Sequence, residues 1–145
     1  MLRTTLGEMI EGQTLLALPP EASVHQAAVR MRERHVGSVL VTGATGQLLG
    51  IFTERDAICR VLADALDPAQ TPLSQVMTRS PATLPPDALA LDALRLMRDG
   101  RFRHVPVAHG DRVLGMVSFT DFRGVDLTRL QQRLEDENGM FEALR

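Results

Sequence analysis

The hydrophobic positions of this chain fall into two similar series. Residues 18–41 align with residues 84–107 at an offset of 66 positions, and nine of the 24 aligned residues are identical. After one deletion in the loop that follows, residues 49–56 align with residues 114–121. Matching segments of this length indicate an internal repeat, in which each copy forms about half of the fold.

The first half of each copy predicts a short strand and a helix. The runs TLLALPP and PATLPP are extended and end at proline pairs. The apolar residues that follow recur at i, i+3, i+4 and i+7, which is typical of a helix with one buried stripe. These stripes are Val24, Ala27, Ala28 and Met31 in the first copy and Ala90, Ala93, Leu94 and Met97 in the second.

The second half of each copy predicts a strand pair and another helix. SVLVT and LLGIF in the first copy, like HVPVA and VLGMV in the second, are strand runs joined by loops whose glycines suit hairpin turns. The next helix is expected to start at Thr53 and at Ser118. A motif of about 50 residues has too small a core to be stable alone. The pattern therefore predicts an α+β fold, in which two β-α-β-β-α motifs pack through their small sheets.

Proline spacing and the apolar pattern also predict the boundaries of the segments. LGEMI near the start resembles LSQVM before the second copy. The tail carries Leu127, Leu130 and Leu134 at three- and four-residue steps, and we expect its helix to break at Asn138–Gly139. The predicted segments are a first motif with the N-terminal segment in residues 1–66, a linker in residues 67–79, a second motif in residues 80–125 and an amphipathic helix in residues 126–145.

Composition excludes several classes of partner. The formal net charge is −2, and the chain has no Trp, no Tyr and five Phe, so neither a basic field nor aromatic platforms favour nucleic acid. No apolar run has the roughly 18–20 residues of a membrane span. The start of the chain also lacks the apolar stretch of a secretory signal. We expect a cytoplasmic protein with no nucleic-acid or membrane partner.

The residue pattern favours binding over catalysis. The chain contains no glycine-rich P-loop and no Ser/His/Asp or Cys/His arrangement. A single cysteine, Cys59, excludes an internal disulfide and a cysteine-rich zinc site, and the histidines stand apart from other metal ligands. We expect no catalytic residue, no catalytic cofactor and no metal.

One seven-residue phrase occurs twice, as GIFTERD in residues 50–56 and as GMVSFTD in residues 115–121. A hydroxyl residue three positions before an aspartate is typical of a helix capping box. The same aspartate can also bind the hydroxyls of a ribose, as acidic residues do in other nucleotide sites. Recurrence at the same place in both copies favours sugar binding, and the two roles are compatible.

The segment RFRH, residues 101–104, directly precedes a predicted buried strand. The planar fork of donors on arginine matches phosphate well, whereas the alternative is a solvated loop with surface arginines. In the first copy Gly37 stands where the second has Arg103. A phosphate contact from the first copy would therefore depend on Arg34 or Arg55.

The duplicated pattern includes RHVPV in the second copy, VMT before that copy and the repeated closing phrase. With these motifs it resembles the cystathionine-β-synthase (CBS) domain pair, a Bateman-type module that we expect to stand alone. The resemblance implies a regulatory or sensor module that binds an adenosine-containing ligand (AMP, ADP, ATP, NAD or S-adenosylmethionine) in clefts between the copies. In this family the closing aspartate binds the ribose, and cations before HVPV meet phosphate. The residues that the resemblance assigns to ligand contact are Thr14, Leu16, His35, Val36, Gly37, Thr53, Arg55, Asp56, Ser80, Ala82, Phe102, Arg103, His104, Val105, Pro106, Ser118, Thr120 and Asp121.

The resemblance also implies a homodimer formed through helices. Each copy carries two helices, and one small sheet cannot cover the apolar residues of both. The stripe on the first copy is Ile58, Val61, Leu62 and Leu66. Alternatively, the C-terminal helix covers the stripes within one chain. For function, the alternative is a structural interaction module with the same fold and no nucleotide.

Overall fold

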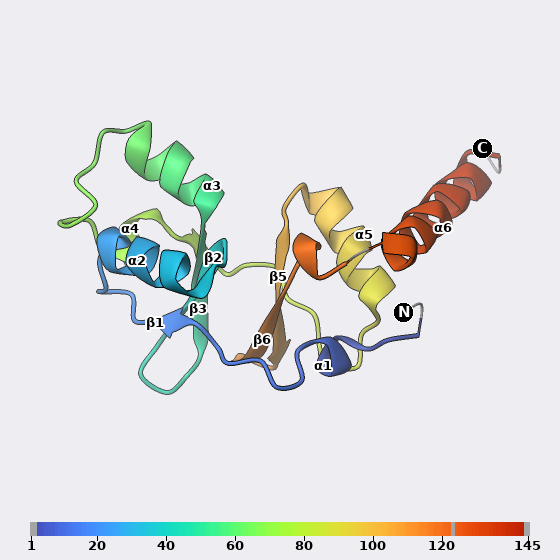
Figure 1. Ribbon diagram of the computed structural model, residues 1–145, viewed down its shortest axis with the longest axis horizontal. Coiled ribbons are helices and arrows are strands. Elements are labelled where there is room, and N and C mark those ends of the chain that lie inside the picture. Colours follow the sequence, from blue (N-terminus) through green and yellow to red (C-terminus); the bar gives the residue numbers. More distant parts are fainter. Residues whose placement is uncertain (1–2, 123, 144–145) are drawn as a thin grey trace.

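The computed structural model describes residues 3–122 and 124–143, and of residues 124–126 and 141–143 it describes the backbone alone. The two motifs lie side by side with their sheets in the middle and most helices on the outer sides (Figure 1). A hydrogen bond of 2.8 Å from the Leu48 amide to the Asp111 carbonyl joins the two hairpins. The predicted α+β fold with sheets packed together is confirmed.

The first motif forms a four-stranded sheet in the order β1-β2-β3-β4. The strand β1 pairs in parallel with β2, and the other neighbours are antiparallel. The elements of this motif are β1 (Ala17–Leu18), α2 (Val24–Arg34), β2 (Ser38–Thr42), β3 (Leu48–Thr53), α3 (Glu54–Asp56), the π-helical η1 (Ala57–Leu62) and β4 (Thr78–Arg79).

The second motif repeats this order with a two-stranded antiparallel sheet. An isolated parallel bridge between Leu84 and Val107 stands where β1 pairs Leu18 with Val41 in the first motif. The elements are α5 (Ala90–Gly100), β5 (His104–His109), β6 (Arg112–Ser118), the 3₁₀-helical η2 (Phe119–Asp121) and α6 (Gly124–Ala143).

Two short helices precede the two copies. The helix α1 (Leu6–Met9), before the first copy, packs into the core of the second motif, and the helix α4 (Leu73–Val76), before the second copy, packs into the core of the first. Leu6 is buried among second-motif residues, whereas Leu73 is buried in the first core. The backbone bonds are equivalent: the Leu6 amide donates to the Ala88 carbonyl, and the Leu73 amide to the Ala22 carbonyl, each at 2.8 Å. The helix α1 of the N-terminal segment thus packs with the second motif, and residues 67–79 contain the helix α4 and the strand β4, which pack with the first. The predicted segment boundaries stay predictions.

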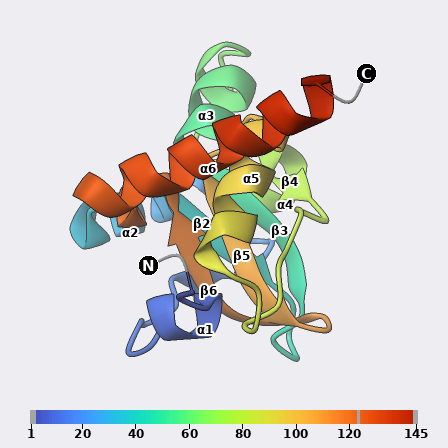
Figure 2. The same cartoon turned by 90° about the vertical axis from the view of Figure 1, so that its right-hand side faces the viewer.

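Two details of the helices also differ from the sequence pattern. Ala28 is exposed rather than buried, whereas Leu94 at the equivalent position is covered, because α6 crosses the outer side of α5 (Figure 2). The helix α6 continues through Asn138–Gly139 instead of breaking there. A glycine inside a helix costs only about 1 kcal/mol relative to alanine, which the continuing helix tolerates.

Candidate functional site

The repeated phrase caps the turn after the second strand of each hairpin, as predicted. The Thr53 amide donates to Asp56 Oδ2 at 3.0 Å, and the Asp56 amide donates to Thr53 Oγ1 at 3.3 Å. In the second motif the Ser118 amide donates to Asp121 Oδ2 at 2.8 Å. Capping therefore fixes Asp56 just after β3 and Asp121 just after β6.

A cleft with a volume of about 1170 Å³ lies between the motifs. The first motif contributes the segment before β1 and the turn from α2 to β2. The second motif contributes the start of β5 and the capped turn after β6. The predicted site residues that this cleft brings together are Thr14, Leu16, His35, Val36, Gly37, Arg103, His104, Ser118, Thr120 and Asp121.

A tight turn at the end of α2 shapes the first-motif wall of this cleft. His35 has a left-handed backbone with φ of 53°, and its amide donates to the Arg32 carbonyl, which ends the helix. Val36 follows and remains 40% exposed. The turn thus presents an apolar side chain and main-chain groups, a surface that suits the flat face of a heterocycle.

Three arginines supply positive charge to the same cleft. Arg32 and Arg34 come from the last turn of α2, and Arg103 precedes β5. Arg34 Nη2 donates to the Thr14 carbonyl at 2.6 Å, which fixes the guanidinium against the first-motif wall. The Arg103 guanidinium lies over the Phe119 ring, 4.6 Å from its centroid. Planar guanidinium groups on two walls of a cleft can bind a phosphate.

Carboxylates balance part of this charge. Glu54 and Asp121 both line the cleft. A Cβ added at Gly37 would lie 2.8 Å from Glu54 Oε1, so the absence of a side chain there makes room for this carboxylate. The cleft therefore presents acceptors for hydroxyl groups beside donors for an anion.

His104 is half-buried at the start of β5 and lines the cleft. Burial lowers the pKa of its imidazole below the ordinary value of 6.5, and the nearby Arg103 charge lowers it further. The Glu54 and Asp121 carboxylates act in the opposite direction but do not outweigh burial. The imidazole is therefore mainly neutral at pH 7.

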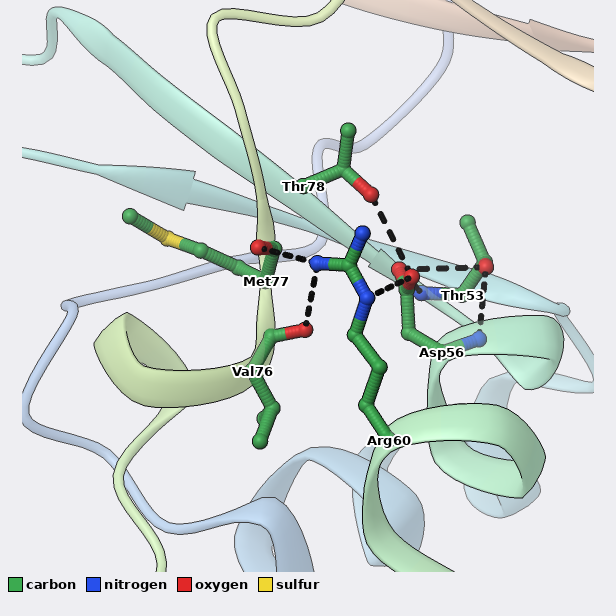
Figure 3. Close-up of polar contacts among 6 residues, drawn as sticks. All are labelled: Thr53, Asp56, Arg60, Val76, Met77 and Thr78. Carbon is green, nitrogen blue, oxygen red and sulfur yellow. Dashed lines mark hydrogen bonds and ion pairs between the residues drawn. The ribbon is translucent and has the colours of Figure 1, made fainter. Parts of the chain in front are cut away.

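The remaining predicted site residues do not line this cleft. Asp56 is buried, with Thr78 and Arg60 on its carboxylate (Figure 3). Val105 and Pro106 are buried within β5, and Phe102 packs against the second core. A part in ligand binding stays a prediction for Thr53, Arg55, Asp56, Ser80, Ala82, Phe102, Val105 and Pro106.

The cleft also includes residues that the sequence did not single out. Glu54 occupies a variable position of the repeated phrase, so the phrase did not indicate a role for it. Arg32 lies on the predicted polar face of a helix, so the apolar period did not indicate a role for it either. Phe119 is the neighbour of Ser118 in the phrase, and only the fold brings its ring to Arg103. Other lining residues of this kind are Gln13, Ser38 and Met116.

Together the fold and the cleft define a class: an α+β module of two similar motifs that share a polar cleft. The CBS domain family matches residues 12–63 and 73–127, and the chain belongs to this family. The family resemblance seen in the sequence is thus confirmed. Within the described residues, no helix is long and apolar enough to cross a membrane.

Similar proteins agree with this assignment. CBS domain-containing protein CBSCBSPB3 of Arabidopsis thaliana is 36% identical over 129 residues, which cover 89% of this chain and 23% of that relative. The chain therefore spans less than a quarter of this relative's length. The crystal structure of the CBS-domain containing protein ATU1752 from Agrobacterium tumefaciens is 32% identical, with a TM-score of 0.74, and the match covers 81% of this chain and 95% of that one.

A third similar protein was solved with a bound nucleotide. CBS domain protein PAE2072 from Pyrobaculum aerophilum, complexed with AMP, is 23% identical with a TM-score of 0.78. The match covers 88% of this chain and 98% of that chain. At this identity the likeness shows the shared fold.

Proposed function

We propose that this chain is a regulatory module that binds an adenosine-containing ligand in the cleft between its two motifs. One observation carries the proposal. The Ser118–Asp121 turn of the second motif and the His35–Ser38 turn of the first line the same cleft. A ligand that contacts both turns would bridge the motifs.

Each part of such a ligand has a matching surface. The Asp121 carboxylate is exposed on the cleft and accepts hydrogen bonds, as a ribose diol requires. Leu16 and Val36 offer apolar contact for adenine beside main-chain groups. Arg34 and Arg103 offer charge-assisted hydrogen bonds to phosphate. The AMP complex of the Pyrobaculum aerophilum protein, which has the same fold, supports this class of ligand.

The proposed mechanism is linked to binding rather than to catalysis. A ligand that contacts both motifs stabilises the arrangement in which those contacts exist. It can shift the equilibrium only by the difference in its affinity for the two arrangements. The regulated process belongs to whatever partner responds to that arrangement. The cytoplasm stays the predicted compartment.

Calorimetric titration with AMP, ADP, ATP, NAD and S-adenosylmethionine tests the proposal. We expect at least one of them to bind at about micromolar concentration, which corresponds to roughly 8 kcal/mol. Asp121→Asn should weaken that ligand about tenfold or more, because an amide cannot accept both ribose hydroxyls with full charge. Mass spectrometry of small molecules released from purified protein should identify the same compound. Absence of heat and of a thermal shift with every ligand would favour the structural interaction module.

We also propose that two copies associate through the first motif. Ile58 and Leu62 on η1 are 59% and 71% exposed. Val61 of the same predicted stripe is buried in the first core, and Leu66 packs against that core. On the second motif α6 covers α5 through Leu130 and Leu134. The open apolar surface is therefore narrower than the sequence pattern indicates.

A further inference from the structure

The two aspartates of the repeated phrase have different surroundings. Asp56 is 7% exposed, whereas Asp121 is exposed on the cleft. Asp56 Oδ2 accepts from the Thr53 amide at 3.0 Å, and Oδ1 accepts from the Thr78 hydroxyl at 3.2 Å. Both carboxylate oxygens of Asp56 thus already have partners within the chain.

Arg60 completes this arrangement. Its Nε lies 3.7 Å from Asp56 Oδ1, and its Nη1 donates to the Met77 carbonyl at 2.8 Å and to the Val76 carbonyl at 3.3 Å (Figure 3). We call Thr53, Asp56, Arg60 and Thr78 the Asp56 cluster. It joins the helix after the first hairpin to the segment between the motifs.

The sequence of the second motif repeats the phrase but not the residues that bind Asp56 in the first. At the offset of the repeated phrase, Arg60 aligns with Val125. Counted from the equivalent helices α1 and α4, Thr78 matches Glu11. A valine cannot pair with a carboxylate, and glutamate would repel one. The sequence itself therefore restricts this cluster to the first motif.

Arg55 distinguishes the two motifs in a second way. It occupies the phrase position that Thr120 holds in the second motif, and Thr120 lines the cleft together with His35. Arg101 has the same left-handed backbone as His35 and matches it in the repeat. Arg55 Nη1 reaches across to the Arg101 carbonyl, a long hydrogen bond of 3.4 Å. Arg101 and Arg55 therefore occupy the positions that match His35 and Thr120 of the cleft, and the Arg55 side chain spans the space between them.

We infer that this chain binds one adenosine ligand, beside Asp121, and that Asp56 has a structural role in place of a sugar-binding one. A ribose at Asp56 would have to displace the Thr78 hydroxyl and the Arg60 guanidinium. That exchange would break the hydrogen bond from the half-buried Thr78 hydroxyl and the ion pair with the half-exposed Arg60, and it is costly because the Asp56 carboxylate is itself buried. The number of ligands rests on the proposed function, whereas the structural role of Asp56 does not.

Calorimetric titration with AMP and thermal unfolding, on matched variants of the full chain, separate the two aspartates. For the unaltered chain we expect one AMP per chain. Asp121→Asn should weaken AMP about tenfold or more and change the unfolding midpoint little, because the side-chain oxygen of the new asparagine still accepts from the Ser118 amide. Asp56→Asn should keep one site with affinity within about twofold, and lower the midpoint by about 4 °C or more.

Thr78→Val serves as a milder variant if Asp56→Asn fails to fold. It removes the hydroxyl donor with nearly constant volume, and we expect a lower midpoint with AMP affinity unchanged. Two AMP molecules per chain, or the loss of a site in either first-motif variant, would overturn the inference. Unchanged midpoints in both of these variants would also overturn it. If AMP does not bind the unaltered chain, the ligand that does bind replaces it in these titrations. If none of the five ligands binds, the number of ligands falls with the proposed function, and the midpoints alone decide the role of Asp56.

Discussion

Arg103 is a residue whose environment favours contact with phosphate. Its guanidinium is held over the Phe119 ring, and it is exposed on the cleft that contains Asp121. Stacking on a ring holds the planar group while leaving its edge donors available for an anion. Arg34 on the opposite wall uses part of its fork on the Thr14 carbonyl. Arg103 is therefore the better candidate for recognition of a charged group.

Arg103→Ala should weaken AMP more than it weakens adenosine. Losing a charge-assisted hydrogen bond costs about 1.5–3 kcal/mol, or roughly ten- to hundredfold in affinity. Parallel titrations of the variant with AMP and adenosine measure the difference. Arg129→Ala, on the exposed surface of α6, is the matched control and should leave both affinities unchanged. Equal losses for AMP and adenosine would show that the phosphate lies elsewhere.

His104 links the cleft to pH. Because burial lowers the pKa of His104 in the folded state, the folded protein binds fewer protons here than the unfolded chain does. The stability that this group contributes is therefore fully present above pH 6.5 and is lost as the pH falls through the lowered folded pKa. His104→Gln should make the unfolding midpoint less sensitive to pH below 6.5 than in the unaltered chain.

Thermal unfolding between pH 5 and 8 measures this dependence. His109→Gln is the control, because His109 is exposed at the other end of the same strand. It should retain the pH dependence of the unaltered chain. An identical slope in the His104→Gln and His109→Gln variants would show that His104 does not contribute.

At the scale of elements, periodicity predicts what each segment forms better than where it packs. The strand pairs and the helices α2 and α5 follow from alternation and from the 3.6-residue period. The patterns of LGEMI and LSQVM do not predict which motif each segment packs against, because both are short apolar segments and either motif could cover them. Only tertiary contact settles that α1 joins the second core and α4 the first. The exposure of Ala28 has the same cause, since the covering helix α6 exists on one motif only.

Prediction of the candidate site from the sequence has the same limit. The repeated phrase makes Asp56 and Asp121 look equivalent, although Arg55 and Arg60 stand near Asp56 where the second motif has Thr120 and Val125. Thr78, which binds the Asp56 carboxylate, is 22 positions away in the chain. The sequence thus predicts ten of the residues that line the cleft, whereas the difference between the two motifs depends in part on a contact that is distant along the chain.

At the scale of the whole molecule, the outer faces of the two motifs differ in how their apolar residues are covered. The helix α6 covers the outer face of the second motif (Figure 2). On the first motif η1 leaves Ile58 and Leu62 largely exposed. Closed two-fold dimers are the commonest assembly of soluble proteins, and in them the same patch meets itself. A two-fold dimer would bring the η1 helices of two copies together.

Leu62→Lys should therefore weaken self-association, because a lysine paired with its own symmetry mate places like charges in an apolar contact. Light scattering over a concentration series measures the mass, and we expect the unaltered chain to approach twice 15.9 kDa at tens of micromolar. Met140→Lys is the matched control, since Met140 is also 66% exposed but lies on α6. It should leave the mass unchanged. A mass near 15.9 kDa for the unaltered chain, with and without AMP, would contradict the dimer. A stronger effect of Met140→Lys than of Leu62→Lys would instead place the interface on the second motif.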